Sequence, residues 1–247
     1  MPLHLYGVVP VTGSEPQVGH GRQDRPVRLV QGSGLRAVVS EIAEDAPVRR
    51  DDLLAHAHVL EALAAAVPVV PVQFGTIVPD EDAVVRDVLE PQHADLLALL
   101  DAFADVVQLT VEVSHREEAA LRELLLRDPD LAALRDHVRA HPAAQQEKMR
   151  LGEAVVAGLE ALRADDAAVV VDRVAPHVHA VAENEPRGTQ GVANLALLVD
   201  REEHTALDEA VTLLGEELGP RAQVRYVGPQ PPWSFLDPVA NGDLAWA

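Results

Sequence analysis

Two histidines in an amphipathic segment are the first residues of this chain whose type could do chemistry. His56 and His58 lie within residues 50–66, where Leu53, Ala57 and Leu60 recur at helical spacing. Positions two apart on a helix do not face each other, so the histidines make a poor metal pair. We expect both to be polar residues on the helix surface.

A second histidine pair occurs later in the chain. His177 and His179 would share one face of a strand, and Glu183 and Glu185 follow close by in sequence. Two histidines and a carboxylate can bind a catalytic metal. A strand end with a polar face explains the same residues. A metal-dependent enzyme using His177, His179 and Glu183 therefore remains an open alternative.

Other catalytic patterns are missing from the sequence. No dinucleotide or phosphate-loop motif occurs, and Gly32-Ser-Gly34 is short enough to be only a turn. Ser40 has no nucleophile elbow around it. Asp80-Glu-Asp82 is explained by a helix N-terminus, where a capping side chain and acidic neighbours are favoured. We predict no catalytic residue, no metal and no cofactor.

Aromatic residues gather near the C-terminus. Both tryptophans, Trp233 and Trp246, lie there, and Trp233 and Phe235 follow a proline run that stiffens the chain. A chain with only 3% aromatic residues is expected to dock such side chains into a groove. We expect the groove in the N-terminal domain of the same chain, and a partner protein is the alternative.

Composition limits the class of protein. The 247 residues are 48% hydrophobic, so a large core is possible, and the absence of cysteine excludes disulfides and thiolate zinc sites. Twenty Lys and Arg against 40 Asp and Glu give a net charge of -20. This charge disfavours binding to nucleic acid or to anionic membranes. No apolar run is long enough for a membrane span, and the N-terminus lacks the pattern of a signal peptide.

The elements that must position these residues follow from hydrophobic periodicity. In the first half, the pattern predicts strands over 3–9, 34–40 and 69–74, a long loop over 10–33, and helices over 50–66, from Asp80 and through 96–103. The strand at 69–74 contains Pro71 and follows Pro68. Because proline lacks an N–H, we expect this strand at a sheet edge or bulge.

The second half reads as β-α-β-β-α-β from Val106. Strands are predicted over 106–113, 169–175 with a possible extension over 179–182, 193–199 and 221–227. Ser114 with Glu117, and Asp200 with Glu203, resemble caps of the intervening helices. The fold class is therefore α+β, with a ferredoxin-like C-terminal domain. We predict domains over 1–104 and 105–228, and a tail over 229–247.

Several segments together resemble the gas vesicle protein GvpF/GvpL family. They are Leu5-Tyr-Gly-Val-Val9, Leu35-Arg-Ala-Val-Val-Ser40, Asp51-Asp-Leu-Leu-Ala-His-Ala-His-Val-Leu-Glu61, Val70-Pro-Val-Gln-Phe-Gly-Thr76, Lys148-Met-Arg-Leu-Gly-Glu153, Asn194-Leu-Ala-Leu-Leu-Val-Asp200 and Gly228-Pro-Gln-Pro-Pro-Trp-Ser-Phe235. They occur in the family's order over essentially the whole chain. Gln73 departs from the pattern, because a basic residue is expected there.

The resemblance implies a non-enzymatic protein that helps to assemble gas vesicles in the cytoplasm, or is a minor component of them. It implies binding to the hydrophobic shell protein, gas vesicle protein A, and to other accessory proteins. It also implies an unusual α+β N-terminal domain and a modified ferredoxin-like C-terminal domain. A regulatory domain that binds a small molecule is the alternative. Candidate partner-binding or structural residues are Val70, Pro71, Gln73, Phe74, Gly75, Trp233 and Phe235.

Overall fold

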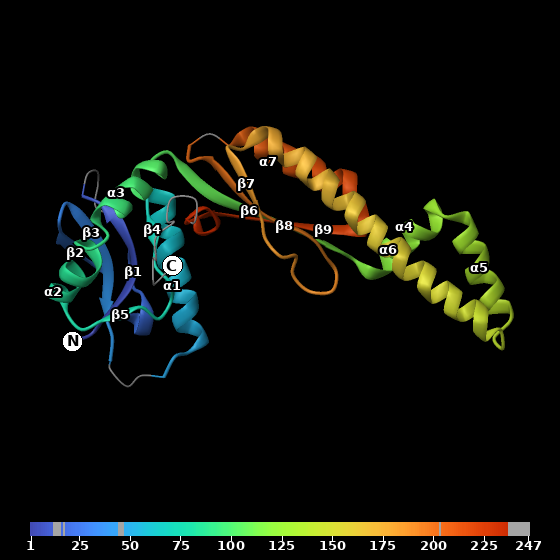
Figure 1. Ribbon diagram of the computed structural model, residues 1–247, viewed down its shortest axis with the longest axis horizontal. Coiled ribbons are helices and arrows are strands. Elements are labelled where there is room, and N and C mark those ends of the chain that lie inside the picture. The colour runs from blue at the N-terminus through green and yellow to red at the C-terminus, as the bar shows by residue number, and fades with distance from the viewer. Residues whose placement is uncertain (12–15, 17, 44–46, 203, 237–247) are drawn as a thin grey trace. The chain divides into compact units, whose positions relative to one another are not determined.

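The computed structural model describes residues 1–11, 16, 18–43, 47–202 and 204–236. The chain forms two compact units (Figure 1). The first unit contains residues 1–109, 198–203 and 227–247, and the second contains residues 110–197 and 204–226. Each unit is described separately below.

The first unit is built on an antiparallel sheet whose strands differ in length and whose central strand is buried. Strand β1 (Leu3–Pro10) lies between β3 (Leu35–Glu41) and β4 (Val70–Pro71), and β2 (Arg28–Gly32) extends the sheet beyond β3. A further strand, β5 (Ile77–Val78), also pairs with β1. All four partnerships are antiparallel. Every residue of β1 except Pro10 is buried, so this strand forms the centre of the core.

Strand β2 lies inside the segment that was predicted to be a loop. It pairs with β3 through a tight turn at Ser33 and Gly34, whose φ angles are 52° and 76°. Positive φ at both central residues is the conformation of a hairpin turn that matches the twist of its strands. The turn predicted at Gly32-Ser-Gly34 is therefore confirmed, and the loop prediction for 28–32 is wrong.

The proline-marked strand is shorter than predicted. Only Val70 and Pro71 pair with β1, opposite Val8 and Gly7. Val72 N donates to Tyr6 O at 2.8 Å, and the chain then turns through Phe74 and Gly75 before β5. Proline supplies no N–H, so the ladder cannot continue through it. The predicted edge position is confirmed, and the predicted length is wrong.

Helices cover this sheet. They are α1 (Arg50–Ala66), the 3-10 turn η1 (Arg22–Asp24), α2 (Glu81–Ala83), the π-helical turn η2 (Val84–Leu89) and α3 (His93–Ala102). Asp80 caps α2 as predicted, because its carboxylate accepts the N–H of Ala83 at 2.8 Å. In α1 the buried side contains Asp52, His56, Val59, Leu60, Leu63 and Ala64. Leu53 is exposed, although its helical spacing with Ala57 and Leu60 predicts that it lies on the buried face.

The predicted β-α-β-β-α-β order from Val106 is confirmed, with the second strand at the possible extension over 179–182 and not at 169–175. The elements are β6 (Val106–His115), α4 (Glu117–Arg127), α5 (Pro129–Ala140), α6 (Gln145–Val174), β7 (Ala180–Glu183), β8 (Gly191–Asp200), α7 (Thr205–Leu218) and β9 (Ala222–Gln230). Short 3-10 turns are η3 (Ala175–His177), η4 (Gly219–Arg221) and η5 (Trp233–Phe235). The strands form a sheet in the order β7-β8-β6-β9.

One predicted strand is a helix. Residues up to Val174 belong to α6, in which Leu162, Asp166, Val170 and Val174 are buried at intervals of four. Valine costs a helix only a fraction of a kcal/mol, about 0.5 or less, and burial of one face outweighs that cost.

Two predicted helix caps also need correction. Ser114 lies within β6, and α4 starts after Arg116 without a side-chain cap. Helix α7 starts after His204, also without one. Glu203 of the other predicted cap lies outside the described residues.

Candidate functional site

A groove in the first unit brings together three of the predicted binding residues. Its volume is about 290 Å³, and its walls are Leu53, His56, Ala57, Leu60 and Glu61 of α1, Gln73 and Phe74 of the turn after β4, and Gln230, Pro231 and Trp233 near the end of the described chain. Figure 1 shows the red C-terminal segment beside α1. Segments far apart in sequence therefore form one largely apolar surface.

The other predicted residues lie elsewhere. Val70 and Pro71 are buried in β4, and Phe235 is buried in η5. Gly75 has a φ of 98°, a conformation that side chains rarely adopt, and it forms the turn that presents Phe74. Trp233 lines the groove and is 37% exposed, so about a third of its surface is open to solvent.

A buried histidine pair lies behind the groove. His56 Nε2 is 3.1 Å from Val72 O, and a carbonyl oxygen can only accept, so Nε2 carries the proton. His56 Nδ1 then accepts from His4 Nε2 at 2.9 Å. This assignment leaves His4 Nδ1 without a proton, and that buried atom has no hydrogen-bond partner among the described residues. Both rings are neutral in this arrangement.

The environment of the pair explains its neutrality. Burial, together with the nearby His56 and Arg22, lowers the pKa of His4 to about 3. Burial also lowers the pKa of His56, to about 4, against the opposing effect of the Val72 carbonyl. The prediction that His56 lies on the helix surface is wrong, whereas His58 is exposed as expected.

Phe74 connects this buried pair with the groove. Its ring lies edge-on to His4 and to His56, with centroid distances of 5.4 and 5.5 Å. The guanidinium carbon of Arg22 is 5.6 Å from the centroid of the same ring. Phe74 is half-buried, so its inner part packs on the histidines while its outer part lines the groove.

Tyr6 also packs against the buried histidine pair. Its ring stacks on His56 at a centroid distance of 5.2 Å. Its hydroxyl accepts the N–H of Arg22 at 2.7 Å and forms a hydrogen bond of 2.8 Å with Ser40 Oγ, in which either hydroxyl can donate. Burial raises the pKa of the Tyr6 hydroxyl, so it stays protonated. The side wall around Phe74 is thus held in place by buried hydrogen bonds.

The geometry of the groove favours apolar binding over catalysis. Both nitrogens of His56 are already occupied by hydrogen bonds, so this histidine offers no free base. Across the part of the chain that the structure describes, no three His, Asp or Glu side chains gather as a metal site. His177 lies in η3 and His179 precedes β7, so they do not share a strand face as predicted.

A larger hollow on the first unit has a different character. It is about 590 Å³ in volume, and its lining includes His20, Asp24, Arg49, Asp51 and His58. Asp52 also lines it, and its carboxylate accepts the backbone N–H groups of Arg49 at 2.9 Å and Gln23 at 3.3 Å. Charged and histidine side chains make up much of its lining, and none of the predicted binding residues line it.

Comparisons with known proteins decide the family. A family model described as "Gas vesicle synthesis protein GvpL/GvpF" matches residues 2–237. The chain belongs to the GvpL/GvpF family. A protein of Streptomyces sp. (strain CB03234), named gas vesicle protein F, is 32% identical over 243 residues, which is 96% of this chain and 100% of the relative. The gas vesicle protein F of Dolichospermum flosaquae is 23% identical over 238 residues, or 95% of this chain and 97% of that one.

Solved GvpF structures share the fold. The crystal structure of GvpF from Anabaena sp. PCC7120 has a TM-score of 0.79 at 23% identity and covers 96% of this chain and 98% of its own. GvpF from Microcystis aeruginosa has a TM-score of 0.74 at 22% identity, covering 96% and 99%. The family resemblance and the α+β fold class predicted from sequence are thereby confirmed.

Membership in the GvpL/GvpF family gives the chain a role connected with gas vesicles. The relatives are named as gas vesicle proteins and not as enzymes. Within the described residues, no helix has both the length and the apolarity needed to cross a membrane.

Proposed function

We propose that this protein assists gas vesicle assembly in the cytoplasm by binding the hydrophobic shell protein, gas vesicle protein A, together with other accessory proteins, and that it is not an enzyme. The observation that carries this proposal is the apolar groove of the first unit. Its rim offers Leu53, Phe74 and Trp233, three large side chains that are only partly buried. Such a surface suits a protein partner with apolar side chains.

The net charge of the protein and the apolar groove both suit this role. A very hydrophobic shell subunit must be kept from aggregating before assembly. A partner with a net charge of -20 stays soluble, and its groove can cover apolar surface of the subunit. The rigid support of Phe74 lowers the entropy that would be lost on binding. Trp233 and Phe74 are the anchors that we expect to contribute most.

Two neighbouring leucines provide a matched test. Leu53 lines the groove and is 51% exposed, whereas Leu54 is 46% exposed and does not line it. Leu53→Asp should weaken binding to gas vesicle protein A by at least about 30-fold, since a buried unpaired charge at an interface costs about 2 kcal/mol or more. Leu54→Asp introduces the same charge on the same helix and should leave binding within about threefold.

Binding can be measured by co-purification and by titration of labelled gas vesicle protein A in detergent-free buffer. Equal effects of the two variants would contradict the groove as the binding site. Trp233→Ala should also weaken binding, by about tenfold or more. Val70→Asp is unsuitable for this purpose, because Val70 is buried in β4 and a charge there would unfold the unit.

The alternative of a ligand-binding regulatory domain has less support. A ferredoxin-like unit would hold a ligand between its helices and its sheet. The hollow of the second unit, about 280 Å³, is instead lined by α6, η3 and α7, including Arg173, His177 and Leu213. No strand residue lines this hollow.

A further inference from the structure

A helical arm in the second unit has a basic end that takes no part in the groove. We call residues 116–163 the arm: they comprise α4, α5 and the first part of α6. In Figure 1, α5 and the start of α6 project beyond the strands of their unit. The arm end is Arg139, Lys148, Met149 and Arg150, around the turn between α5 and α6, and all four are exposed.

The arm differs in charge from the rest of the chain. It contains eight of the 20 Lys and Arg but only nine of the 40 Asp and Glu. The remaining residues therefore carry 12 Lys and Arg against 31 Asp and Glu. Lys148 is the only lysine of the chain. An acidic protein thus has one nearly neutral arm with a basic end.

The cations at the arm end are not used within the unit. Nearer the sheet, Arg122 pairs with Glu118 at 3.2 Å and Arg127 pairs with Glu123 at 2.8 Å. Arg139, Lys148 and Arg150 make no ion pair with any residue that the structure describes. These three charges are available for an external carboxylate.

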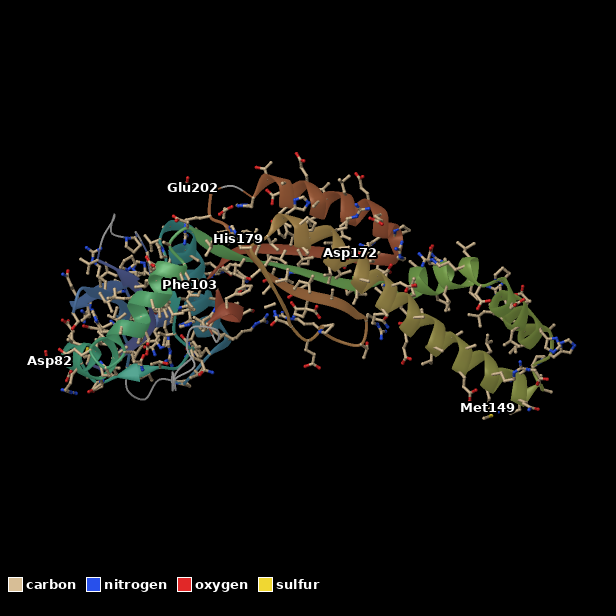
Figure 2. The ribbon with its side chains drawn as sticks, turned by 45° about the horizontal axis from the view of Figure 1, so that its top comes forward. Asp82, Phe103, Met149, Asp172, His179 and Glu202 are labelled. Carbon is tan, nitrogen blue, oxygen red and sulfur yellow. The ribbon has the colours of Figure 1, made fainter. Side chains whose placement is uncertain are left out.

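The arm end also presents an apolar side chain on a supported helix pair. Met149 is 63% exposed between Lys148 and Arg150, and Figure 2 shows it near the start of α6. Gly158 of α6 packs against Leu124 of α4 so closely that an added Cβ would lie 2.7 Å from Leu124 Cδ1. Asp128 caps α5 by accepting the N–H of Leu131 at 2.9 Å. Packing between α4 and α6 and the cap of α5 therefore support the arm that carries the basic end.

We propose that the arm end docks on the acidic surface of a second copy of this chain. Charge complementarity carries the proposal, because the same molecule supplies both the free cations and the excess carboxylates. At physiological ionic strength the screening length is about 8 Å, so the contact responds to the local charges and less to the net charge of each copy. Exposed ion pairs contribute little individually, so we expect weak association that salt abolishes.

The contact has a definite symmetry. A basic end that meets an acidic surface uses two different patches, so the interface is heterologous and can continue from copy to copy. This inference does not depend on the groove or on the proposed function, and it can be tested with the purified chain alone.

The single lysine makes the test specific. A carbodiimide activates a carboxylate, and the Lys148 amine then forms an amide bond with it while the carbodiimide takes up the elements of water as a urea. We would crosslink a mixture of ¹⁵N-labelled and unlabelled protein. The expected result is a mixed-label peptide pair that contains Lys148, abundant at 20 mM NaCl and reduced at least fivefold at 300 mM NaCl.

Charge reversal provides the independent measurement. Arg139→Glu combined with Arg150→Glu should weaken self-association at least fivefold in sedimentation velocity. Arg122→Glu combined with Arg127→Glu changes the net charge equally on the same arm and should weaken it less than twofold. Circular dichroism confirms that the helices remain in each variant.

Three outcomes would overturn the proposal. The first is a Lys148 crosslink that joins residues of one label only. The second is equal weakening by the two double variants, which would indicate general repulsion. The third is association that requires added gas vesicle protein A or another acidic protein, because the occupant of the arm end would then be that partner.

Discussion

At the residue scale, His4 and His56 are neutral because burial opposes the protonation of both rings. Their pKa values of about 3 and 4 lie below the ordinary value of 6.5. Between pH 6.5 and 4 the unfolded chain therefore binds protons that the folded chain does not bind. The stability that the pair contributes is complete above pH 6.5 and is lost as the pH falls toward 4.

The first prediction follows from the lowered pKa values of the two histidines. The free energy of unfolding should fall by several kcal/mol between pH 7 and pH 4, since each unit of pKa shift corresponds to about 1.4 kcal/mol. His56→Gln should be less stable at pH 7 but should lose less stability on acidification. Urea denaturation at pH 7, 6 and 5 measures both slopes, with pH 5 placed above most carboxylate titration. Identical slopes would rule out the histidine pair as the cause.

A second buried group lies at the centre of the second unit. Asp166 accepts from His115 Nε2 at 2.9 Å and from both Nε and Nη2 of Arg221, at 3.0 and 2.8 Å. Burial alone would raise the pKa of Asp166, but hydrogen bonds from His115 and Arg221 outweigh burial and lower it to about 2. The network joins α6 to the end of β6 and to the turn before β9.

The second prediction is that Asp166→Asn lowers the free energy of unfolding by about 3 kcal/mol or more, because it leaves a largely buried guanidinium without its carboxylate. Asp165→Asn changes the exposed neighbour on the same helix and should stay within about 0.5 kcal/mol. Denaturation followed by circular dichroism compares the two. A loss below about 1 kcal/mol for Asp166→Asn would show that solvent replaces the network.

At the element scale, the close approach of β4 to β1 depends on Gly7. A Cβ at this position would lie 2.8 Å from Val70 O, closer than real Cβ contacts come, and a tight 3.0 Å from Val69 Cγ2. The oxygen belongs to the backbone of β4, so it cannot turn aside as a side chain would. Gly7 therefore sets the spacing of the edge that leads into the Phe74 turn.

The third prediction is that Gly7→Ala destabilises the protein by about 1–3 kcal/mol, the usual cost of overpacking. Gly19→Ala is the control, because nothing lies within 4 Å of a Cβ there. Tryptophan fluorescence is a suitable probe, since Trp233 lies in the same unit. A neutral Gly7→Ala would mean that β4 can move outward without cost.

At the scale of the whole molecule, the net charge of -20 opposes the compact state by self-repulsion. The fourth prediction is that raising NaCl from 10 to 150 mM at low micromolar concentration raises the melting temperature by about 2–4 °C, equivalent to about 1 kcal/mol. Differential scanning calorimetry measures the change. A decrease would indicate that the surface ion pairs contribute more than the repulsion removes.

The sequence predicted the fold where local patterns and packing agree. The β-α-β-β-α-β order, the helix over 50–66 and the Asp80 cap all follow from periodicity and capping, which act over a few residues. Prediction failed at 169–175, where a run of valines favours a strand but continues a long helix. There the burial of Val170 and Val174 against the rest of the unit overrides the preference of valine.

The candidate site could be predicted only in part. Collinear motifs identified the family and pointed to Gln73, Phe74 and Trp233, because such motifs can be read along the chain. The segment Asp51–Glu61 contains Leu53 and His56, but the motifs did not place either residue in the groove, since that depends on how α1 is rotated against the sheet. The buried strand β1, with His4 and Tyr6 on one face, was the available signal for a polar cluster behind α1.

By itself, the sequence determined the family, the fold class and the acidic character of the protein, since these depend on residue type and order. Only the tertiary structure decided that Phe74 and Trp233 share a groove, that His4 donates a hydrogen bond to His56, and that Arg139, Lys148 and Arg150 remain unpaired with any described residue. The physical reason is that these properties depend on distances between residues remote in sequence. Packing of the whole core sets those distances, and no local pattern encodes them.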